Sequence, residues 1–122
     1  MFDHVGIPVS NLERSRAFYA ATLVPLGVQE LMEFEGAVAF GVDAPQFWIV
    51  QGAPAVASPR LHVAFVATTP LEVDTFHRAA LDAGGVDHGA PGPRPQYAEH
   101  YYAAFVLDPD GHNVEAVCRR GT

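Results

Sequence analysis

The chain repeats itself at a fixed offset of 58 residues, and this repeat constrains the fold more than any other feature. The dipeptide His4-Val5 recurs as His62-Val63, and Gly27-Val28 recurs as Gly85-Val86. Between residues 4 and 28, seven residues are identical to those 58 positions later. A repeat longer than one helix or strand indicates two copies of one supersecondary unit. The sequence therefore predicts two similar modules that share a core.

Each copy carries the pattern of a strand, a helix and three further strands. In the first copy, period-2 and period-3.6 patterns bounded by turn residues predict these elements at 3–9, 12–23, 28–34, 37–42 and 47–50. In the second copy they predict a strand at 61–67, a helix at 70–81 and a hairpin of strands at 101–107 and 113–118. The remaining strand of this copy, the sixth of the chain, has the weakest pattern, and a Gly/Pro-rich loop at 89–95 delays the strands that follow. We therefore expect an α+β fold of two βαβββ modules, about 1–52 and 60–122, joined by a linker at 53–59 into one domain.

Capping boxes mark where both helices begin. Ser10 is followed three residues later by Glu13, and Thr69 is followed three residues later by Glu72. In such a box the hydroxyl residue is the N-cap and the acidic side chain reaches back to it. The sequence predicts Ser10 and Thr69 as the two N-caps.

Charge and composition exclude several classes of protein. The net charge of −7 would repel a nucleic acid backbone. Apolar runs are too short to cross a membrane, and the chain does not open with a signal-peptide pattern. The single cysteine, Cys118, fits a reducing compartment. We expect a cytoplasmic protein that binds neither nucleic acid nor membranes.

Three polar residues interrupt strands that are otherwise apolar: His4, His62 and Glu115. Because their neighbours in sequence are apolar, the three side chains are expected on the sheet face away from the helices. One strand histidine is more often structural than a ligand, but two at equivalent repeat positions are harder to explain by packing alone. Two imidazoles and a carboxylate suit Zn, Ni, Mn, Co or Fe(II), so we predict one divalent metal ion.

Four segments resemble the vicinal oxygen chelate superfamily: Asp-His-Val-Gly-Ile at 3–7, Leu-Glu-Arg-Ser-Arg-Ala-Phe-Tyr at 12–19, His-Val-Ala-Phe at 62–65 and Asp-Pro-Asp-Gly-His-Asn-Val-Glu at 108–115. That superfamily includes glyoxalase I, methylmalonyl-CoA epimerase, extradiol dioxygenases, fosfomycin-resistance transferases and bleomycin-binding proteins. The resemblance covers nearly the whole chain. It implies paired modules whose curved mixed sheets form a cup with the helices outside.

By resemblance, metal ligands come from the first, fourth, fifth and eighth strands, which places His4, His62 and Glu115 at three of the four positions. The fourth strand departs from the pattern, because the repeat places either Val50 or Trp48 opposite Glu115, and neither can bind a metal. Gln51 points to the other face unless a bulge redirects it. We therefore expect three protein ligands with open positions for substrate, and Trp48 and Val50 as walls of the pocket.

The Gly/Pro-rich stretch and the residues after it supply the remaining candidates. His100 and Tyr102 are candidate catalytic groups together with Glu115, while Arg94 and Tyr101 are candidate substrate contacts. Packing within a solvated loop is the competing explanation for this cluster. His88 and His112 lie near turns and are expected to be solvated.

The resemblance implies a metal-dependent protein that acts on a small oxygenated organic substrate. Whether the reaction is of the lyase, isomerase, transferase or dioxygenase type is left open. The alternative is a non-catalytic small-molecule-binding protein similar to bleomycin resistance proteins. Because short modules leave sheet edges exposed, we also expect a homodimer.

Overall fold

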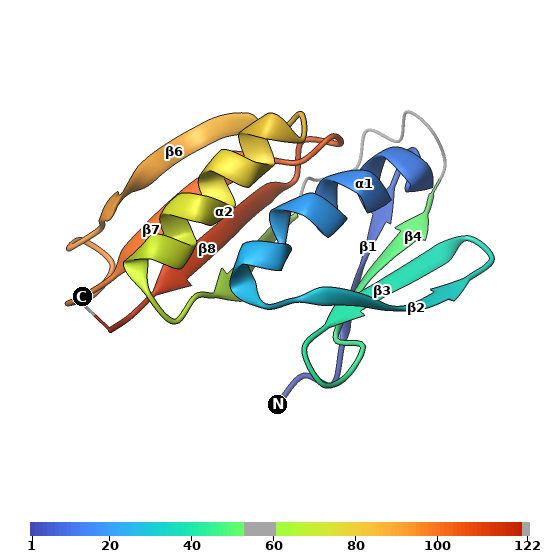
Figure 1. Cartoon of the computed structure of the whole chain (residues 1–122), viewed down its shortest axis with the longest axis horizontal. Coiled ribbons are helices and arrows are strands. Elements are labelled where there is room, and N and C mark those ends of the chain that lie inside the picture. Colours follow the sequence, from blue (N-terminus) through green and yellow to red (C-terminus); the bar gives the residue numbers. More distant parts are fainter. Residues whose placement is uncertain (53–60, 121–122) are drawn as a thin grey trace.

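Two βαβββ modules follow one another along the chain in the computed structural model, which describes residues 1–52 and 61–120 (Figure 1). The first comprises β1 (Val5–Val9), α1 (Leu12–Thr22), a short 3-10 helix η1 (Val24–Leu26), β2 (Gln29–Phe34), β3 (Ala37–Gly41) and β4 (Phe47–Gln51). The second comprises β5 (His62–Val66), α2 (Pro70–Asp82), β6 (Val86–Pro93), β7 (Tyr102–Leu107) and β8 (Asn113–Cys118). The predicted linker at 53–59 lies outside the described residues.

Each module forms its own four-stranded mixed sheet. The strand order is β1-β4-β3-β2 in the first and β5-β8-β7-β6 in the second. In both, the first and last strands of the module pair in parallel and the remaining pairs are antiparallel. The predicted α+β class and the paired βαβββ plan are confirmed, and both sheets are open rather than closed into a barrel.

One hydrophobic core joins the modules. Alternate strand residues such as Ile7, Ile49 and Val114 point toward the helices and are fully buried with Phe18 and Phe76. The two helices pack against each other, and each covers one face of its own sheet (Figure 1). On the opposite face of each sheet, residues 1–52 and 61–120 place no helix. Among the described residues, no helix is both long and apolar enough to span a membrane.

Residues 89–93 of the Gly/Pro-rich stretch belong to a strand, so the prediction of a loop was wrong there. β6 extends through Pro93 and pairs with β7, with register shifts between Asp87 and Gly89 and between Gly89 and Gly92. As an edge strand, β6 needs fewer backbone donors, and bulges accommodate residues that break a regular ladder. Edge position therefore overrode the poor strand propensity of this segment.

Of the two predicted N-caps, Thr69 is confirmed and Ser10 was wrong. The Thr69 hydroxyl accepts a hydrogen bond from the backbone N–H of Glu72. In α1 the cap is Asn11, whose side chain accepts from the backbone N–H of Arg14. The Ser10 N–H instead donates to both carboxylate oxygens of Asp110, at 3.1 Å each. A contact with the other module thus displaced the local capping preference.

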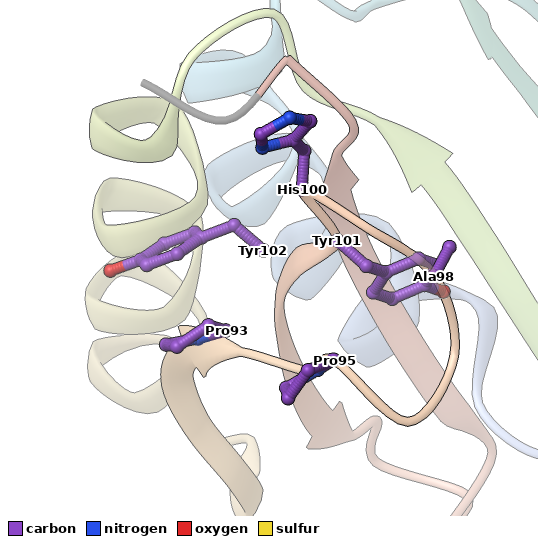
Figure 2. A pocket seen from close by; sticks show the side chains of 6 residues that line it. All are labelled: Pro93, Pro95, Ala98, His100, Tyr101 and Tyr102. Atoms are coloured by element: carbon purple, nitrogen blue, oxygen red, sulfur yellow. The ribbon is translucent and has the colours of Figure 1, made fainter.

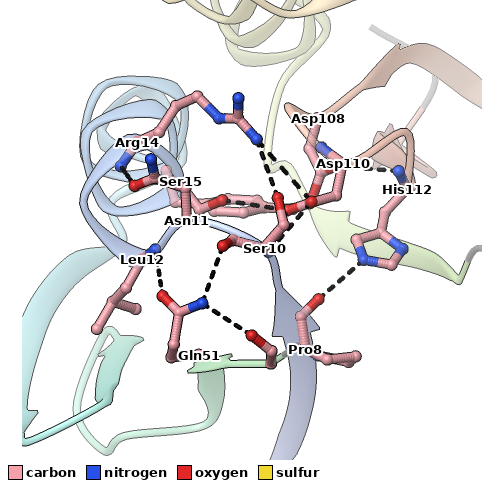
Figure 3. A network of polar contacts seen from close by, with 12 residues as sticks. Pro8, Ser10, Asn11, Leu12, Arg14, Ser15, Gln51, Asp108, Asp110 and His112 are labelled. Carbon is pink, nitrogen blue, oxygen red and sulfur yellow. Dashed lines mark hydrogen bonds and ion pairs between the residues drawn. The ribbon is translucent and has the colours of Figure 1, made fainter. Parts of the chain in front are cut away.

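A polar network links the modules at the turn between β7 and β8 (Figure 3). His112 lies at one side of this network and is 4% exposed, so the expectation that it is solvated was wrong. Its Nδ1 accepts from the backbone N–H of Leu61 at 3.0 Å, and its Nε2 donates to the Pro8 carbonyl at 3.0 Å. Both ring nitrogens are therefore used in holding β5 and β1 together.

Candidate metal site

The helix-free face of the second sheet carries the candidate site. Ala64 of β5 and Phe105 of β7 are the register partners of Glu115 in the central strand β8. His62 pairs with Asn113, two residues away along β8, so its side chain is a diagonal neighbour of Glu115 on the same face. The Phe105 ring stacks against the His62 imidazole with ring centroids 6.2 Å apart. Strand register therefore brings His62 and Glu115 together, as the alternation in the sequence predicted.

Glu115 is buried, and each of its carboxylate oxygens has its own partner. The residue is 2% exposed. Oε1 lies 3.0 Å from His62 Nε2, and Oε2 accepts a hydrogen bond from the Tyr101 hydroxyl. A buried carboxylate without such partners would be strongly destabilising. The sheet thus holds an acceptor group in a dry position with one oxygen directed at an imidazole.

The tautomer of His62 follows from its second contact. His62 Nδ1 lies 3.1 Å from the backbone carbonyl of Asn113. A carbonyl can only accept, so Nδ1 carries a proton, and in the neutral ring Nε2 then has a free lone pair. In that neutral form Nε2 and Glu115 Oε1 are two acceptors in contact, whereas a protonated ring would donate Nε2–H to Oε1 as an ion pair. Such a contact requires a proton or a cation between the two atoms.

The residue pair fits a divalent metal in chemistry and in spacing. Metal-binding histidines commonly donate their other ring N–H to a carbonyl or carboxylate, as His62 does here. Two adjacent ligands of an octahedral ion, each about 2.1 Å from it, would be about 3.0 Å apart, and a hydrogen-bonded pair has the same spacing. The separation between His62 Nε2 and Glu115 Oε1 has that value. Half of the His62 side chain remains exposed, which leaves room for further ligands.

His4 does not join this pair within one chain. It lies immediately before β1 on the first module, is exposed, and places Nδ1 2.6 Å from its neighbour Asp3. Across residues 1–52 and 61–120, no group of three or more His, Cys, Asp or Glu side chains is close enough to hold a metal ion. The three predicted ligands therefore belong to two separate modules.

Strand register decides between the two alignments of the fourth strand. Gly6 pairs with Trp48 across β1 and β4, and its repeat equivalent Ala64 pairs with Glu115 across β5 and β8. Trp48 is thus the counterpart of Glu115. Its ring stacks on Phe34 with centroids 5.9 Å apart, on the face opposite the core residues Phe47 and Ile49. Val50 lies two residues further along that face and is exposed.

Tyr101 connects Glu115 to the loop before β7. Burial, followed by the hydrogen bond to Glu115, raises the pKa of the Tyr101 hydroxyl to about 12. The hydroxyl therefore stays protonated near neutral pH and donates a hydrogen bond to Glu115. Its ring lies edge-on to Tyr97, with centroids 5.3 Å apart, and the Arg119 guanidinium lies 4.8 Å from the ring centroid.

A cavity of about 220 Å³ lies beside Tyr101, where β6 and β7 are joined (Figure 2). Its lining includes three of the candidate residues together with Ala98 and two prolines: His100, Tyr101, Tyr102, Pro93 and Pro95. His100 has a φ of 61°, and no other non-glycine residue in the described part of the chain has a positive φ. Such backbone strain is common at functional sites.

Two of the candidate residues, Tyr102 and Arg94, have partners other than His62 and Glu115. The Tyr102 hydroxyl donates to Asp74 of α2 at 2.7 Å, and this hydrogen bond, followed by burial, raises its pKa. The Arg94 guanidinium donates to the carbonyls of Ala90 and Gly92 and lies 5.5 Å from the Phe105 ring centroid. Phe105 is thus a site residue that the sequence analysis missed. Phe105 alternates along β7 with the core residues Ala104 and Val106, and this pattern could have placed its ring on the same face as Glu115.

Comparison with known proteins gives the family. The sequence model of the Glyoxalase/Bleomycin resistance protein/Dioxygenase superfamily matches residues 1–116. A glyoxalase/bleomycin resistance protein from Albidiferax ferrireducens T118 has a similar structure, with a TM-score of 0.83, 31% identity and 98% of both chains covered. The uncharacterized protein YqjT of Bacillus subtilis (strain 168) is 28% identical over 93% of this chain and 95% of its own length.

The fosfomycin resistance protein FosX of Mesorhizobium loti shares the fold at lower identity. Its structure matches with a TM-score of 0.71 and 19% identity, covering 97% of this chain and 91% of that chain. With a family model that spans both modules and a close structural match over nearly the full length, this chain belongs to the glyoxalase/bleomycin resistance protein/dioxygenase superfamily.

Proposed function

We propose that this protein is a metal-dependent, glyoxalase-like enzyme that acts on a small oxygenated organic substrate. The observation that carries the proposal is the 3.0 Å contact between His62 Nε2 and Glu115 Oε1, two acceptor atoms that need a proton or a cation between them. Members of the superfamily commonly use a divalent metal. Neutral imidazole and carboxylate ligands suit Zn, Ni, Mn, Co or Fe(II).

The third ligand is proposed to be His4 of a second copy of the chain. His4 lies on the first module, away from the pair formed by His62 and Glu115, so a single chain presents an incomplete ligand set. The helix-free sheet faces also expose apolar side chains, with Val66 77%, Phe34 55% and Val50 41% exposed. Exposed apolar residues of this kind mark interaction surfaces. A homodimer that faces the first module of one copy toward the second module of the other would cover them and complete the site.

The roles of the chain's own residues follow from their positions. His62 and Glu115 would hold the ion, and Asn113 fixes the His62 ring through its carbonyl. The bound metal would act as a Lewis acid that stabilises an oxyanion on the substrate. Trp48 and Phe34 would form an apolar wall from the first module. Their rings stack on the helix-free face of that sheet, where Trp48 takes the position that Glu115 has in the second sheet. The reaction type stays open.

The loop cavity is proposed to receive the apolar part of the substrate. Prolines, Ala98 and the rings of two tyrosines line it, and Tyr101 extends from this lining to Glu115. His100 is the exposed titratable group of the lining and the candidate general acid or base. Tyr102 contributes its ring to the cavity, while its hydroxyl is held by Asp74.

The shared core of the two modules supports one domain, and the single free Cys118 supports a cytoplasmic location.

Metal analysis tests the proposal. Protein purified without chelators or a nickel column, then dialysed against Zn, Mn, Ni and Fe(II), should retain one ion per chain. His62→Ala and Glu115→Gln should lose most of this metal. His88→Ala, which removes an exposed histidine of β6, is the matched control and should keep it. If the wild-type protein retains no metal, the metal-dependent function is refuted and non-catalytic small-molecule binding replaces it.

A further inference from the structure

Glu115 has a second partner, Tyr101, which is not one of the predicted metal ligands. The Tyr101 hydroxyl, just before β7, donates a hydrogen bond to Oε2 of the buried carboxylate. His62 Nε2 faces only the other oxygen, Oε1. The two oxygens of Glu115 are therefore unequal: Oε2 is occupied by a neutral donor, and Oε1 is directed toward the imidazole.

The tyrosine ring is itself held in place on more than one side. Tyr97 packs edge-on against it at 5.3 Å, and the Arg119 guanidinium lies over it at 4.8 Å from the centroid. These contacts restrict the direction of the hydroxyl before any ligand binds. A preset donor of this kind fixes the rotation of a carboxylate about its terminal bond.

We propose that Tyr101 is a positioning residue that holds Glu115 so that the carboxylate binds a divalent metal through Oε1 alone. This inference rests on the proposed metal site of His62 and Glu115. It changes the role expected for Tyr101 from contact with substrate to control of a ligand. Without the hydroxyl, the Glu115 carboxylate could rotate, bind through both oxygens or move away from His62.

The neighbouring tyrosine provides a matched control. Tyr102 is adjacent in sequence, also lines the loop cavity and also donates its hydroxyl to a carboxylate, but that carboxylate belongs to Asp74 of α2. Tyr101→Phe and Tyr102→Phe thus remove one hydroxyl each from consecutive residues. Only the first removal touches the proposed ligand.

The test measures Zn(II) affinity by competition with a chromophoric chelator, together with the visible spectrum of the Co(II)-loaded protein. Loss of an outer partner of a metal ligand typically weakens binding about 10–100-fold. We expect that loss in Tyr101→Phe and a change of less than about 3-fold in Tyr102→Phe. The Co(II) bands should shift in Tyr101→Phe alone, because they report the ligand geometry. Thermal melts of the metal-free proteins check that both variants are folded.

The outcomes separate this inference from the function on which it rests. If the wild-type protein binds neither Zn(II) nor Co(II), the proposed metal site is refuted, and the positioning role with it. If the wild-type protein binds both ions and Tyr101→Phe matches it in affinity and in spectrum, the metal site stands and the role of Tyr101 is refuted. Equal losses in both variants would also overturn the role, since they would indicate a general effect on the loop.

Discussion

The Tyr19 hydroxyl, in α1, donates a 2.5 Å hydrogen bond to Oδ2 of Asp108, at the start of the turn between β7 and β8. Both residues are buried, with Tyr19 0% and Asp108 4% exposed. The other carboxylate oxygen of Asp108 accepts from the backbone N–H groups of Asp110 and His112, at 2.9 Å each. This bond therefore ties a helix of the first module to the turn that precedes Glu115 in the second.

Tyr19→Phe should destabilise the protein by about 1.5–3 kcal/mol, because it leaves a buried carboxylate oxygen without its donor. Urea denaturation measures the free energy of unfolding. Tyr102→Phe, which removes a hydroxyl in a more accessible position, is the control and should cost less than about 1 kcal/mol. Equal stability of Tyr19→Phe and wild type would mean that this bond does not hold the modules together.

The contribution of Tyr19 should depend on pH in a defined direction. Burial, then the negative charge of Asp108, raises the pKa of Tyr19 well above its usual value of 10.0. A raised pKa in the folded state means that the stabilisation is complete below pH 10 and is lost as the pH rises through the folded-state value. The stability difference between wild type and Tyr19→Phe should stay constant from pH 7 to 9 and shrink above pH 10. A difference that grows in alkali would contradict the assignment.

Trp48→Glu should add a ligand to the proposed metal site. Register makes Trp48 the counterpart of Glu115, and its side chain lies on the helix-free face. A well-placed carboxylate should raise metal affinity about ten-fold or more, equivalent to 1–2 kcal/mol. Val50→Glu places the same charge two residues away on that face and should not tighten binding. Thermal melts with and without added Zn or Mn distinguish the two variants.

Two other outcomes for Trp48→Glu and Val50→Glu would contradict this assignment. If Val50→Glu tightens metal binding and Trp48→Glu does not, residue 50 occupies the ligand position. If Trp48→Glu melts much lower and gains nothing from metal, Trp48 has a packing role and the open-site arrangement of three ligands is wrong.

A site shared between two copies should show complementation. His4→Ala and His62→Ala homodimers should each lose metal. In a mixed dimer, one site would carry both substitutions and the other would carry neither, so metal should return to half of the sites. Co-expression with two affinity tags isolates the mixed dimer, and metal analysis counts its ions. A mixed dimer without metal would place His4 and His62 in the same site of one chain, and light scattering at about 13 kDa would rule out the dimer itself.

The repeated glycines should respond differently to alanine. Gly27 ends η1 with a φ of 77° and has open space around an added Cβ, so Gly27→Ala costs only backbone strain of about 1 kcal/mol. At Gly85 an added Cβ would lie 2.8 Å from the Phe18 ring and 2.9 Å from the Ala80 carbonyl. Gly85→Ala should therefore cost about 1–3 kcal/mol through overpacking. Thermal unfolding of the two variants measures the contrast.

Local patterns and the repeat were sufficient for most of the architecture. Alternation along β1, β5 and β8 identified which residues face the core, and the cap at Thr69 marked the start of α2. The same alternation placed His62 and Glu115 on one face. These features depend on period and propensity, which neighbouring residues along the chain determine.

Other features depended on contacts between residues far apart in sequence. Ser10 lost the cap of α1 to Asn11 because Asp110 binds its N–H, and His112 became buried because Leu61 and Pro8 use its ring nitrogens. The edge position of β6 made a strand of a Gly/Pro-rich segment.

The sequence by itself determined the two βαβββ modules and the candidate ligands, because the repeat and the period-2 alternation can be read directly from the order of residues. Only the tertiary structure decided that Trp48 is the counterpart of Glu115, that Tyr101 holds Glu115, and that His4 lies apart from His62 in one chain. The physical reason is that register and the placement of one sheet against another arise from long-range pairing and packing, which no local pattern encodes.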